Sequence, residues 1–142
     1  MNEQTERRRV LFICTHNSAR SHMAEGFLGA RYGDRYEAFS AGTKPSQVNP
    51  LAISVMAEAG IDISGHRSKG VEKFLGQEFD YVVTVCDHAN ETCPFFPGGK
   101  NRLHRGFKDP SAQQGSIEER LIVFRQVRDE MMDWIEETFG SQ

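Results

Sequence analysis

The sequence predicts an α/β fold: one domain over residues 1–142, a doubly wound sheet of four parallel strands with helices on both faces. Two observations predict it. Short apolar runs, typical of strands buried on both faces of a sheet, alternate along the chain with segments whose apolar residues recur at helical spacing. A chain of 142 residues also suits a single domain with one core. In such sheets the crossovers are right-handed, and ligands bind beyond the carboxyl ends of the strands.

Four segments are expected to form the strands. Residues 10–13 and 81–85 are continuous apolar runs, as in the middle of a parallel sheet. Residues 36–41, which end at Gly42, and residues 103–107 have a less continuous apolar pattern.

The helical segments carry their own boundary signals. The first helix is expected to begin near Ser18. Asn49 and Pro50 supply an N-cap and a first-turn proline for a second helix, which is expected to end at Gly60. The segment 116–140 opens with a capping-box sequence and continues with apolar residues at helical spacing, which predicts a long final helix.

Composition and charge exclude several classes of function. The formal net charge is −3 with both signs interspersed, which argues against nucleic-acid binding and against a polybasic membrane patch. No apolar run approaches the ~18 residues of a membrane span, and the N-terminus lacks the apolar core of a signal peptide. We therefore expect a cytoplasmic protein. We also expect a monomer whose residues 1–8 are flexible, with Arg7, Arg8 and Arg9 as a solvated flank.

Cys14 and Arg20 enclose a short segment between the first predicted strand and the first predicted helix. A loop that opens a helix directs backbone N–H groups and the positive end of the helix dipole at one cavity, so anions bind there. The same field favours a nucleophilic thiolate at Cys14. Arg20 can grip two oxygens of a tetrahedral anion such as phosphate or arsenate while Cys14 attacks the central atom. A buried thiol beside a solvated arginine would give the same spacing.

The other two cysteines follow the third predicted strand. Cys86 ends that strand, so it is expected at the same edge of the sheet as Cys14. Helical turns would place Cys86 and Cys93 about 10 Å apart, so a disulfide between them requires unwinding. Two alternatives remain at this point: a pair of free thiols, or a zinc site with His88 and His104 that lacks the usual ligand spacing.

Asp109 precedes Pro110 after the fourth predicted strand. A carboxylic acid at this edge of the sheet is what the protonation of a leaving oxygen requires. Asp-Pro is also an ordinary turn signal, so the sequence leaves both roles open.

With these residues assembled, the chain resembles the low-molecular-weight protein tyrosine phosphatase superfamily and, within it, the thioredoxin-coupled arsenate reductases. The resemblance runs from about residue 10 to residue 139. Its motifs are Cys14-Thr15-His16-Asn17-Ser18-Ala19-Arg20-Ser21, Ser40-Ala41-Gly42, Val48-Asn49-Pro50, Gly60-Ile61-Asp62-Ile63-Ser64, Val82-Val83-Thr84-Val85-Cys86 with Cys93-Pro94, and Gly106-Phe107-Lys108-Asp109-Pro110. The first motif indicates the superfamily, and the spacing of Cys86 and Cys93 indicates the reductase branch.

The resemblance implies a role for each motif residue. Cys14 is the nucleophile, Arg20 the oxyanion clamp and Asp109 the general acid. Ser21 would hydrogen-bond the Cys14 thiolate, and Asn17 would brace the loop through its side-chain amide. The anion would lie on the backbone amides of Thr15, His16, Asn17, Ser18, Ala19 and Arg20.

The resemblance also implies a relay of three cysteines. Cys86 would attack Cys14 once arsenate is attached there, releasing arsenite and leaving a Cys14–Cys86 disulfide. Cys93 would then attack Cys86, and thioredoxin would reduce the Cys86–Cys93 disulfide. No tightly bound cofactor is expected, and phosphate or sulfate would compete with arsenate.

Two departures from the family pattern bear on the site. His16 stands where the family usually has glycine, so its side chain is expected at the pocket mouth. Relatives that bind potassium beside this loop use an acidic residue where Lys69 stands, so its ammonium is expected to replace the ion. Asn17, Glu25 and Ser40 match the rest of that site. No other metal is expected.

Two other functions compete with arsenate reduction. A phosphatase acting on phosphotyrosine or small phosphomonoesters would use Cys14, Arg20 and Asp109 and leave Cys86 and Cys93 idle. A metalloid sensor would hold arsenite on the thiols, and it would need neither a clamp arginine nor a general acid.

Overall fold

The computed structural model describes residues 7–92 and 96–140. Its sheet has four parallel strands in the order β2-β1-β3-β4. The strands are β1 (Arg8–Cys14), β2 (Tyr36–Gly42), β3 (Phe79–Thr84) and β4 (Gly99–His104). The chain places β2 on one side of β1 and then crosses to the other side for β3 and β4. This arrangement confirms the predicted doubly wound α/β fold.

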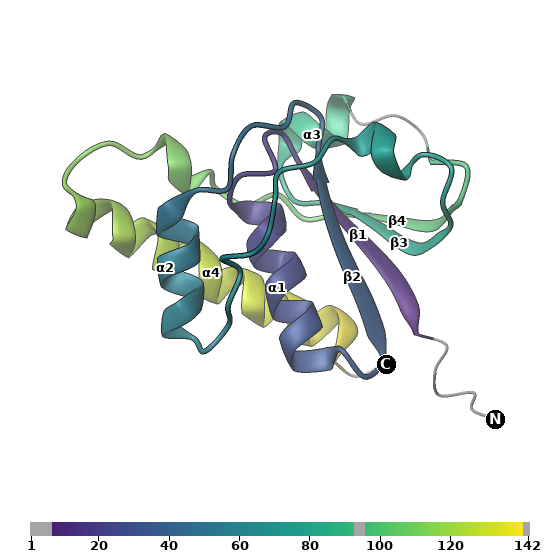
Figure 1. Cartoon of the computed structure of the whole chain (residues 1–142), viewed down its shortest axis with the longest axis horizontal. Helices are drawn as coiled ribbons and strands as arrows, with labels where there is room; N and C mark the ends of the chain where they lie inside the picture. The colour runs from purple at the N-terminus through teal and green to yellow at the C-terminus, as the bar shows by residue number, and fades with distance from the viewer. Residues whose placement is uncertain (1–6, 93–95, 141–142) are drawn as a thin grey trace.

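The helices are connected around this sheet in the expected alternation. They are α1 (Arg20–Tyr32), α2 (Pro50–Glu58), α3 (Asp87–Thr92) and α4 (Ile117–Phe139), with short 3-10 turns η2 (Val71–Phe74) and η3 (Pro110–Ala112). Figure 1 shows α1, α2 and α4 gathered together, with α3 apart from them. Helix α1 packs along β1 and β2, whereas α3 contacts β1 and β3. Among the described helices, none has the length and apolar character needed to cross a membrane.

Three predicted strands are confirmed, with small shifts at their ends. β1 begins at Arg8, which pairs with Tyr36, and Arg7 donates to the Gly33 carbonyl. The chain is therefore hydrogen-bonded from Arg7 onward. Residues 1–6, the rest of the segment expected to be flexible, lie outside the described residues.

The predicted strand at residues 103–107 is wrong in position, because β4 spans Gly99–His104. β4 is an edge strand with mostly exposed side chains, so it contains no apolar run that a sequence pattern could reveal. Phe107, the apolar end of the predicted run, is buried outside the strand. Its ring packs edge-on against Trp134, with 6.3 Å between centroids.

The predicted helix boundaries depend on caps that the structure contains. The Asn49 side chain accepts a hydrogen bond from the Leu51 N–H at 2.8 Å, and Gly60 takes a positive φ of 80° just after α2. At the start of α4, Ser116 Oγ accepts from the Glu119 N–H at 3.1 Å. The Glu119 carboxylate in turn accepts from the Ser116 N–H at 2.8 Å. Both hydrogen bonds of the predicted capping box are therefore present.

Gly26 and Gly29 lie on the same helix, α1, in different surroundings. A Cβ atom at Gly26 would come within 2.6 Å of Ile63 Cγ2, whereas nothing lies within 4 Å of one at Gly29. We predict that Gly26→Ala lowers the free energy of unfolding by about 1–3 kcal/mol through overpacking. Gly29→Ala should raise it by up to about 1 kcal/mol through helix propensity. Urea denaturation measures both, and a Gly26→Ala protein as stable as wild type would contradict this packing.

Candidate active site

Cys14 lies where the sheet changes its direction of winding. It is the last residue of β1, and its side chain is 2% exposed. On one side it pairs with Gly42 of β2, and on the other the Val85 N–H donates to the Ile13 carbonyl at 2.9 Å. Because the carboxyl ends of β1 and β3 meet here, Cys14 and Cys86 are brought to the same edge, as predicted.

The loop after Cys14 is shaped by Asn17. Asn17 is fully buried with a φ of 49°, a left-handed conformation that asparagine tolerates better than most residues. Its side-chain N–H donates to Ser21 Oγ at 2.7 Å, and its side-chain oxygen accepts from the Lys69 backbone N–H at 2.8 Å. α1 therefore begins at Arg20, two residues later than expected. Gly42 permits this shape, since a Cβ there would lie 2.8 Å from the Asn17 nitrogen.

The carbonyl oxygens of the loop accept hydrogen bonds from the backbone of the segment that follows β2. Thr43 N–H donates to the Cys14 carbonyl at 3.2 Å, and Lys44 N–H to that of Thr15 at 2.7 Å. Ser46 N–H donates to the His16 carbonyl at 3.0 Å. Within the part of the chain that the structure describes, the N–H groups of residues 15–19 donate no hydrogen bond. Unpaired N–H groups on a loop that opens a helix form a cradle for an anion.

Ser21 lies between Asn17 and Cys14. Its hydroxyl oxygen is 2.9 Å from Cys14 Sγ, so the contact that the resemblance implies is present. The Asn17 amide donates to this oxygen, and the Ser21 hydroxyl can donate its proton to the sulfur when Cys14 is a thiolate. A hydrogen bond of this direction stabilises a thiolate in preference to a thiol.

Arg20 and Asp109 face each other across a small pocket. Arg20 Nη2 is 3.6 Å from Asp109 Oδ2, and Arg20 Nη1 donates to the Phe107 carbonyl at 3.1 Å. Asp109 Oδ1 accepts from the Ser111 N–H at 3.0 Å, so the residue forms a turn while its second oxygen points at Arg20. The pocket encloses about 70 Å³. It is lined by Cys14, His16, Ser18, Ala19, Arg20, Ser46, Asp109 and Ser111.

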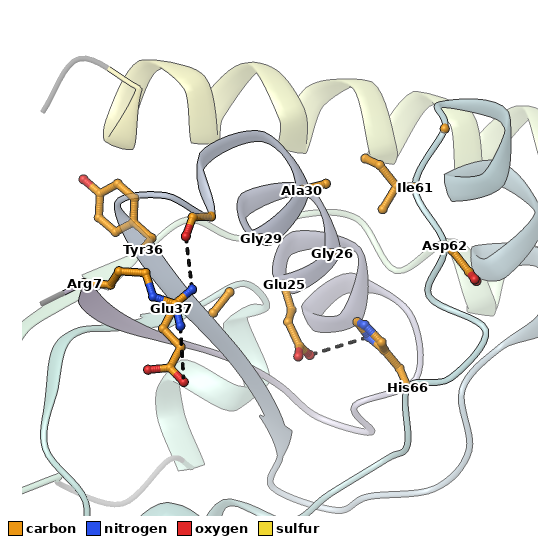
Figure 2. A pocket seen from close by; sticks show the side chains of 13 residues that line it. Arg7, Glu25, Gly26, Gly29, Ala30, Tyr36, Glu37, Ile61, Asp62 and His66 are labelled. Carbon is orange, nitrogen blue, oxygen red and sulfur yellow. Dashed lines mark hydrogen bonds and ion pairs between the residues drawn. The ribbon is translucent and has the colours of Figure 1, made fainter. Parts of the chain in front are cut away.

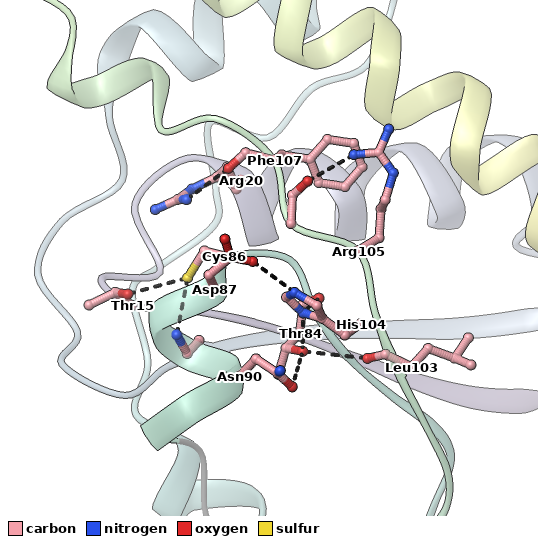
Figure 3. Close-up of polar contacts among 12 residues, drawn as sticks. Thr15, Arg20, Thr84, Cys86, Asp87, Asn90, Leu103, His104, Arg105 and Phe107 are labelled. Carbon is pink, nitrogen blue, oxygen red and sulfur yellow. Dashed lines mark hydrogen bonds and ion pairs between the residues drawn. The ribbon is translucent and has the colours of Figure 1, made fainter.

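A wider cavity of about 520 Å³ adjoins this pocket and reaches the second cysteine. Cys86 Sγ lies 3.3 Å from the hydroxyl of Thr15, the residue that follows Cys14, as Figure 3 shows. Cys86 is buried, and its sulfur also accepts from the Ala89 N–H at 3.4 Å. Cys14 and Cys86 are both free thiols. Cys93 lies outside the described residues.

His104 has other partners than the cysteines. Its Nε2 is 2.8 Å from Asp87 Oδ1, and its Nδ1 is 2.8 Å from Thr84 Oγ1. Figure 3 shows the ring between these two groups, away from Cys86. Both ring nitrogens are engaged, so this geometry disfavours the zinc alternative. The contact arises because Asp87 follows β3 and His104 ends β4, which pairs with β3 in parallel.

The residues expected to form the potassium-site remnant lie close together. Lys69, however, contacts Asn17 through its backbone N–H and not through its ammonium. Asn17 receives the backbone N–H of Lys69, while the Lys69 ammonium donates to the Arg67 carbonyl at 2.7 Å. Burial lowers the pKa of Lys69, and the negative charge of Glu25 opposes that change. Ser40 Oγ donates to Glu25 Oε1 at 2.5 Å. That the Lys69 ammonium replaces potassium stays a prediction.

His22 and His66 were not expected near Glu25. His22 follows Ser21 on α1 and is fully buried. Burial, followed by the positive charges of Lys69 and His66, lowers the pKa of His22 to about 3, against a smaller opposing effect of the Asn17 backbone. His22 is therefore neutral at physiological pH. His66 comes from a segment without helix or strand, so periodicity could not have placed it here.

Comparison with known proteins identifies the family. The family model for low molecular weight phosphotyrosine protein phosphatases matches residues 9–139. The chain belongs to this family. Within it, the chain is 47% identical over 122 residues to an arsenate reductase of Halalkalibacterium halodurans, covering 86% of this chain and 88% of that protein.

Solved structures of arsenate reductases are also similar to this chain. An arsenate reductase in the phosphate-binding state superposes with a TM-score of 0.82 at 33% identity, covering 94% of this chain and 98% of that one. The thioredoxin-dependent arsenate reductase of Corynebacterium glutamicum superposes with a TM-score of 0.68 at 26% identity, covering 97% of this chain and 65% of that one.

We predict that Asn17→Ala destabilises the protein by about 2–4 kcal/mol. The substitution leaves buried partners of the amide unsatisfied and places a Cβ residue without a local hydrogen bond at positive φ. Asn17→Gly should recover about 1 kcal/mol relative to Asn17→Ala, because glycine relieves only the backbone strain. Urea denaturation of the two variants checks the order. Equal stability of Asn17→Ala and wild type would show that these hydrogen bonds do not hold the loop.

Proposed function

We propose that the protein is a cytoplasmic arsenate reductase that uses Cys14, Cys86 and Cys93 in succession, with thioredoxin as the external reductant. The observation that best supports the proposal is the second buried thiol, Cys86. Phosphoester hydrolysis needs only the anion cradle, Cys14 and an acid, whereas here Cys86 lies against the residue after Cys14. The identity to the arsenate reductase of Halalkalibacterium halodurans supports the same choice.

The first step is the attack of Cys14 on arsenate. The unpaired N–H groups of residues 15–19 and the Arg20 guanidinium would hold the anion's oxygens, and the Ser21 hydroxyl would support the thiolate. A sulfur–arsenic bond forms while an arsenic–oxygen bond breaks. Asp109, whose Oδ2 faces Arg20 across the pocket, would protonate the departing oxygen, which leaves as water.

The second step transfers two electrons to arsenic. The Cys86 thiolate attacks the sulfur of Cys14, and the electron pair of the sulfur–arsenic bond passes to arsenic. Arsenate is thereby reduced to arsenite, which leaves, and a Cys14–Cys86 disulfide remains. Cys86 lines the same cavity as Thr15, the residue after Cys14, which supports an approach of Cys86 to the reacting sulfur.

The third step moves the disulfide to where a protein reductant can reach it. Cys93 attacks Cys86, which restores the Cys14 thiol and leaves a Cys86–Cys93 disulfide. Helix α3, Asp87–Thr92, lies between the two cysteines and must unwind for their sulfurs to meet. The thioredoxin-dependent relative in Corynebacterium glutamicum supports thioredoxin as the reductant. A reductant of this kind suits the reducing cytoplasm.

A phosphatase acting on phosphomonoesters is the second candidate, favoured by the pairing of Arg20 with Asp109 above Cys14. The residues after Asp109-Pro110 are Ser111 and Ala112 instead of the tyrosines that line many tyrosine phosphatase clefts. We therefore expect only weak hydrolysis. An NADPH oxidation assay that depends on arsenate, with thioredoxin and its reductase, tests the main proposal against parallel reactions with glutathione and glutaredoxin.

We predict that Cys14→Ser abolishes both arsenate reduction and phosphoester hydrolysis, since a serine hydroxyl is a far weaker nucleophile. Arg20→Lys should lower kcat by about 10²–10³, because an ammonium cannot grip two oxygens at once. Arg31→Lys, at the far end of the same helix, is the matched control and should keep wild-type kinetics. Arsenate turnover by Cys14→Ser would refute the assigned nucleophile.

The two other cysteines separate reductase from phosphatase. We predict that Cys86→Ser and Cys93→Ser keep weak hydrolysis of para-nitrophenyl phosphate, while neither turns over arsenate with thioredoxin. Cys86→Ser should release no arsenite. Cys93→Ser should release one arsenite per chain and stop as a Cys14–Cys86 disulfide, which mass spectrometry of the alkylated protein detects. Repeated turnover by Cys93→Ser at the wild-type rate would refute the relay.

A further inference from the structure

Three metal-ligating atoms converge on one point below the catalytic loop. The Nδ1 atoms of His22 and His66 are 3.1 Å apart, and Glu25 Oε1 lies 3.7 Å from the first and 3.6 Å from the second. His22 and Glu25 are one turn apart on α1, and His66 reaches them from the segment after α2. Figure 2 shows Glu25 and His66 pointing toward each other at the edge of a pocket.

We propose that His22, Glu25 and His66 bind a divalent transition-metal ion of the Zn²⁺ class. Ligand atoms about 2.0–2.1 Å from a tetrahedral zinc ion lie roughly 3.3–3.4 Å from one another, and the three distances here bracket that value. Two imidazoles and a carboxylate are a ligand set that zinc uses in proteins. The fourth position would fall to water or to Ser40 Oγ, which lies 3.4 Å from His22 Nδ1.

The chemistry of the ligands sets which ion is bound. Imidazole nitrogens suit zinc, copper and nickel, whereas potassium, magnesium and calcium prefer oxygen ligands. The proposed site therefore differs in kind from the expected potassium-site remnant, although Glu25 and Ser40 belong to both.

An ion could reach these residues from solvent. Glu25 and His66 line an open cavity of about 450 Å³ on the outside of α1, and their side chains are 21% and 23% exposed. His22, with a side chain that is 0% exposed, does not line the cavity and lies behind Glu25 and His66. A preformed site with a buried ligand and a solvent path loses little order when the ion enters.

The positive charge of Lys69 is expected to weaken metal binding at this site. The positive charge of Lys69 acts on both His22 and Glu25. Replacing Lys69 with glutamine should therefore tighten metal binding, which a purely structural role of the histidine pair would not explain.

A bound ion would connect two supports of the catalytic loop. His22 follows Ser21, which contacts Cys14, and His66 lies three residues before Lys69, whose N–H binds Asn17. The ion would cross-link α1 to this segment, so we expect it to raise the thermal stability of the folded chain.

Titration of the reduced, chelator-treated protein with Co²⁺ tests the proposal. Wild type should bind one ion with the visible absorption of tetrahedral cobalt and without thiolate-to-cobalt charge transfer. His66→Gln and Glu25→Gln should each weaken binding by at least about tenfold. His16→Gln, at the mouth of the catalytic pocket, is the matched control and should bind like wild type. Unchanged binding by His66→Gln, charge transfer from the cysteines, or loss of binding in His16→Gln would overturn the proposal.

A second measurement is independent of spectroscopy and of arsenate turnover. Zn²⁺ should raise the unfolding temperature of a variant with all three cysteines replaced by serine, and adding His66→Gln should remove that rise. Adding Lys69→Gln instead should lower the Zn²⁺ concentration needed for half of the effect. An equal rise with and without His66, or no rise at all, would refute the site.

Discussion

The two hydrogen bonds of the Asn17 side chain are the interaction on which the catalytic loop depends. One bond ties the loop forward to Ser21 on α1, and the other ties it to the backbone of Lys69. Together they hold the left-handed turn at Asn17. The carbonyls of residues 14–16, just before this turn, are bonded outward, and the N–H groups of residues 15–19 are left for an anion. The same amide donates to the oxygen of Ser21, whose hydroxyl contacts the Cys14 sulfur. A single buried amide thus holds both the shape of the cradle and the hydroxyl beside the Cys14 sulfur.

The strand order of the sheet brings the Cys86 thiol to the same edge as Cys14. Cys14 and Cys86 are far apart in sequence, but Cys14 ends the central strand β1 and Cys86 closely follows the central strand β3. Their chemical surroundings differ: Cys14 lies at a pocket that suits a small tetrahedral anion, whereas Cys86 lies on a wider cavity beside a short helix. The sheet holds the anion-binding half, and α3, the helix that the proposed relay would rearrange, lies outside it. This division suits a reaction in which one thiol stays in place and the other has to move.

Local signals in the sequence predicted much of the fold, and long-range contacts account for what they missed. The continuous apolar run before Cys14 and the capping box at Ser116 are encoded within a few residues, so β1 and α4 could be found from pattern alone. The resemblance led to the contact between Ser21 and Cys14. It did not predict that Lys69 would meet Asn17 through its backbone. His66 could not be predicted to lie beside Glu25, because its position depends on how an irregular segment packs against α1.

The side chains of β4 are mostly polar, which is why no apolar pattern predicted this strand. The same polarity affects how the protein behaves in solution. As the outermost strand beyond β3, β4 has backbone groups on its free edge that another chain could pair with. Lys100 and Arg102 are exposed along this strand, and like charges on an approaching identical edge would repel each other. An apolar strand in the same place would have been easier to recognise, and it would also have invited edge-to-edge aggregation during folding.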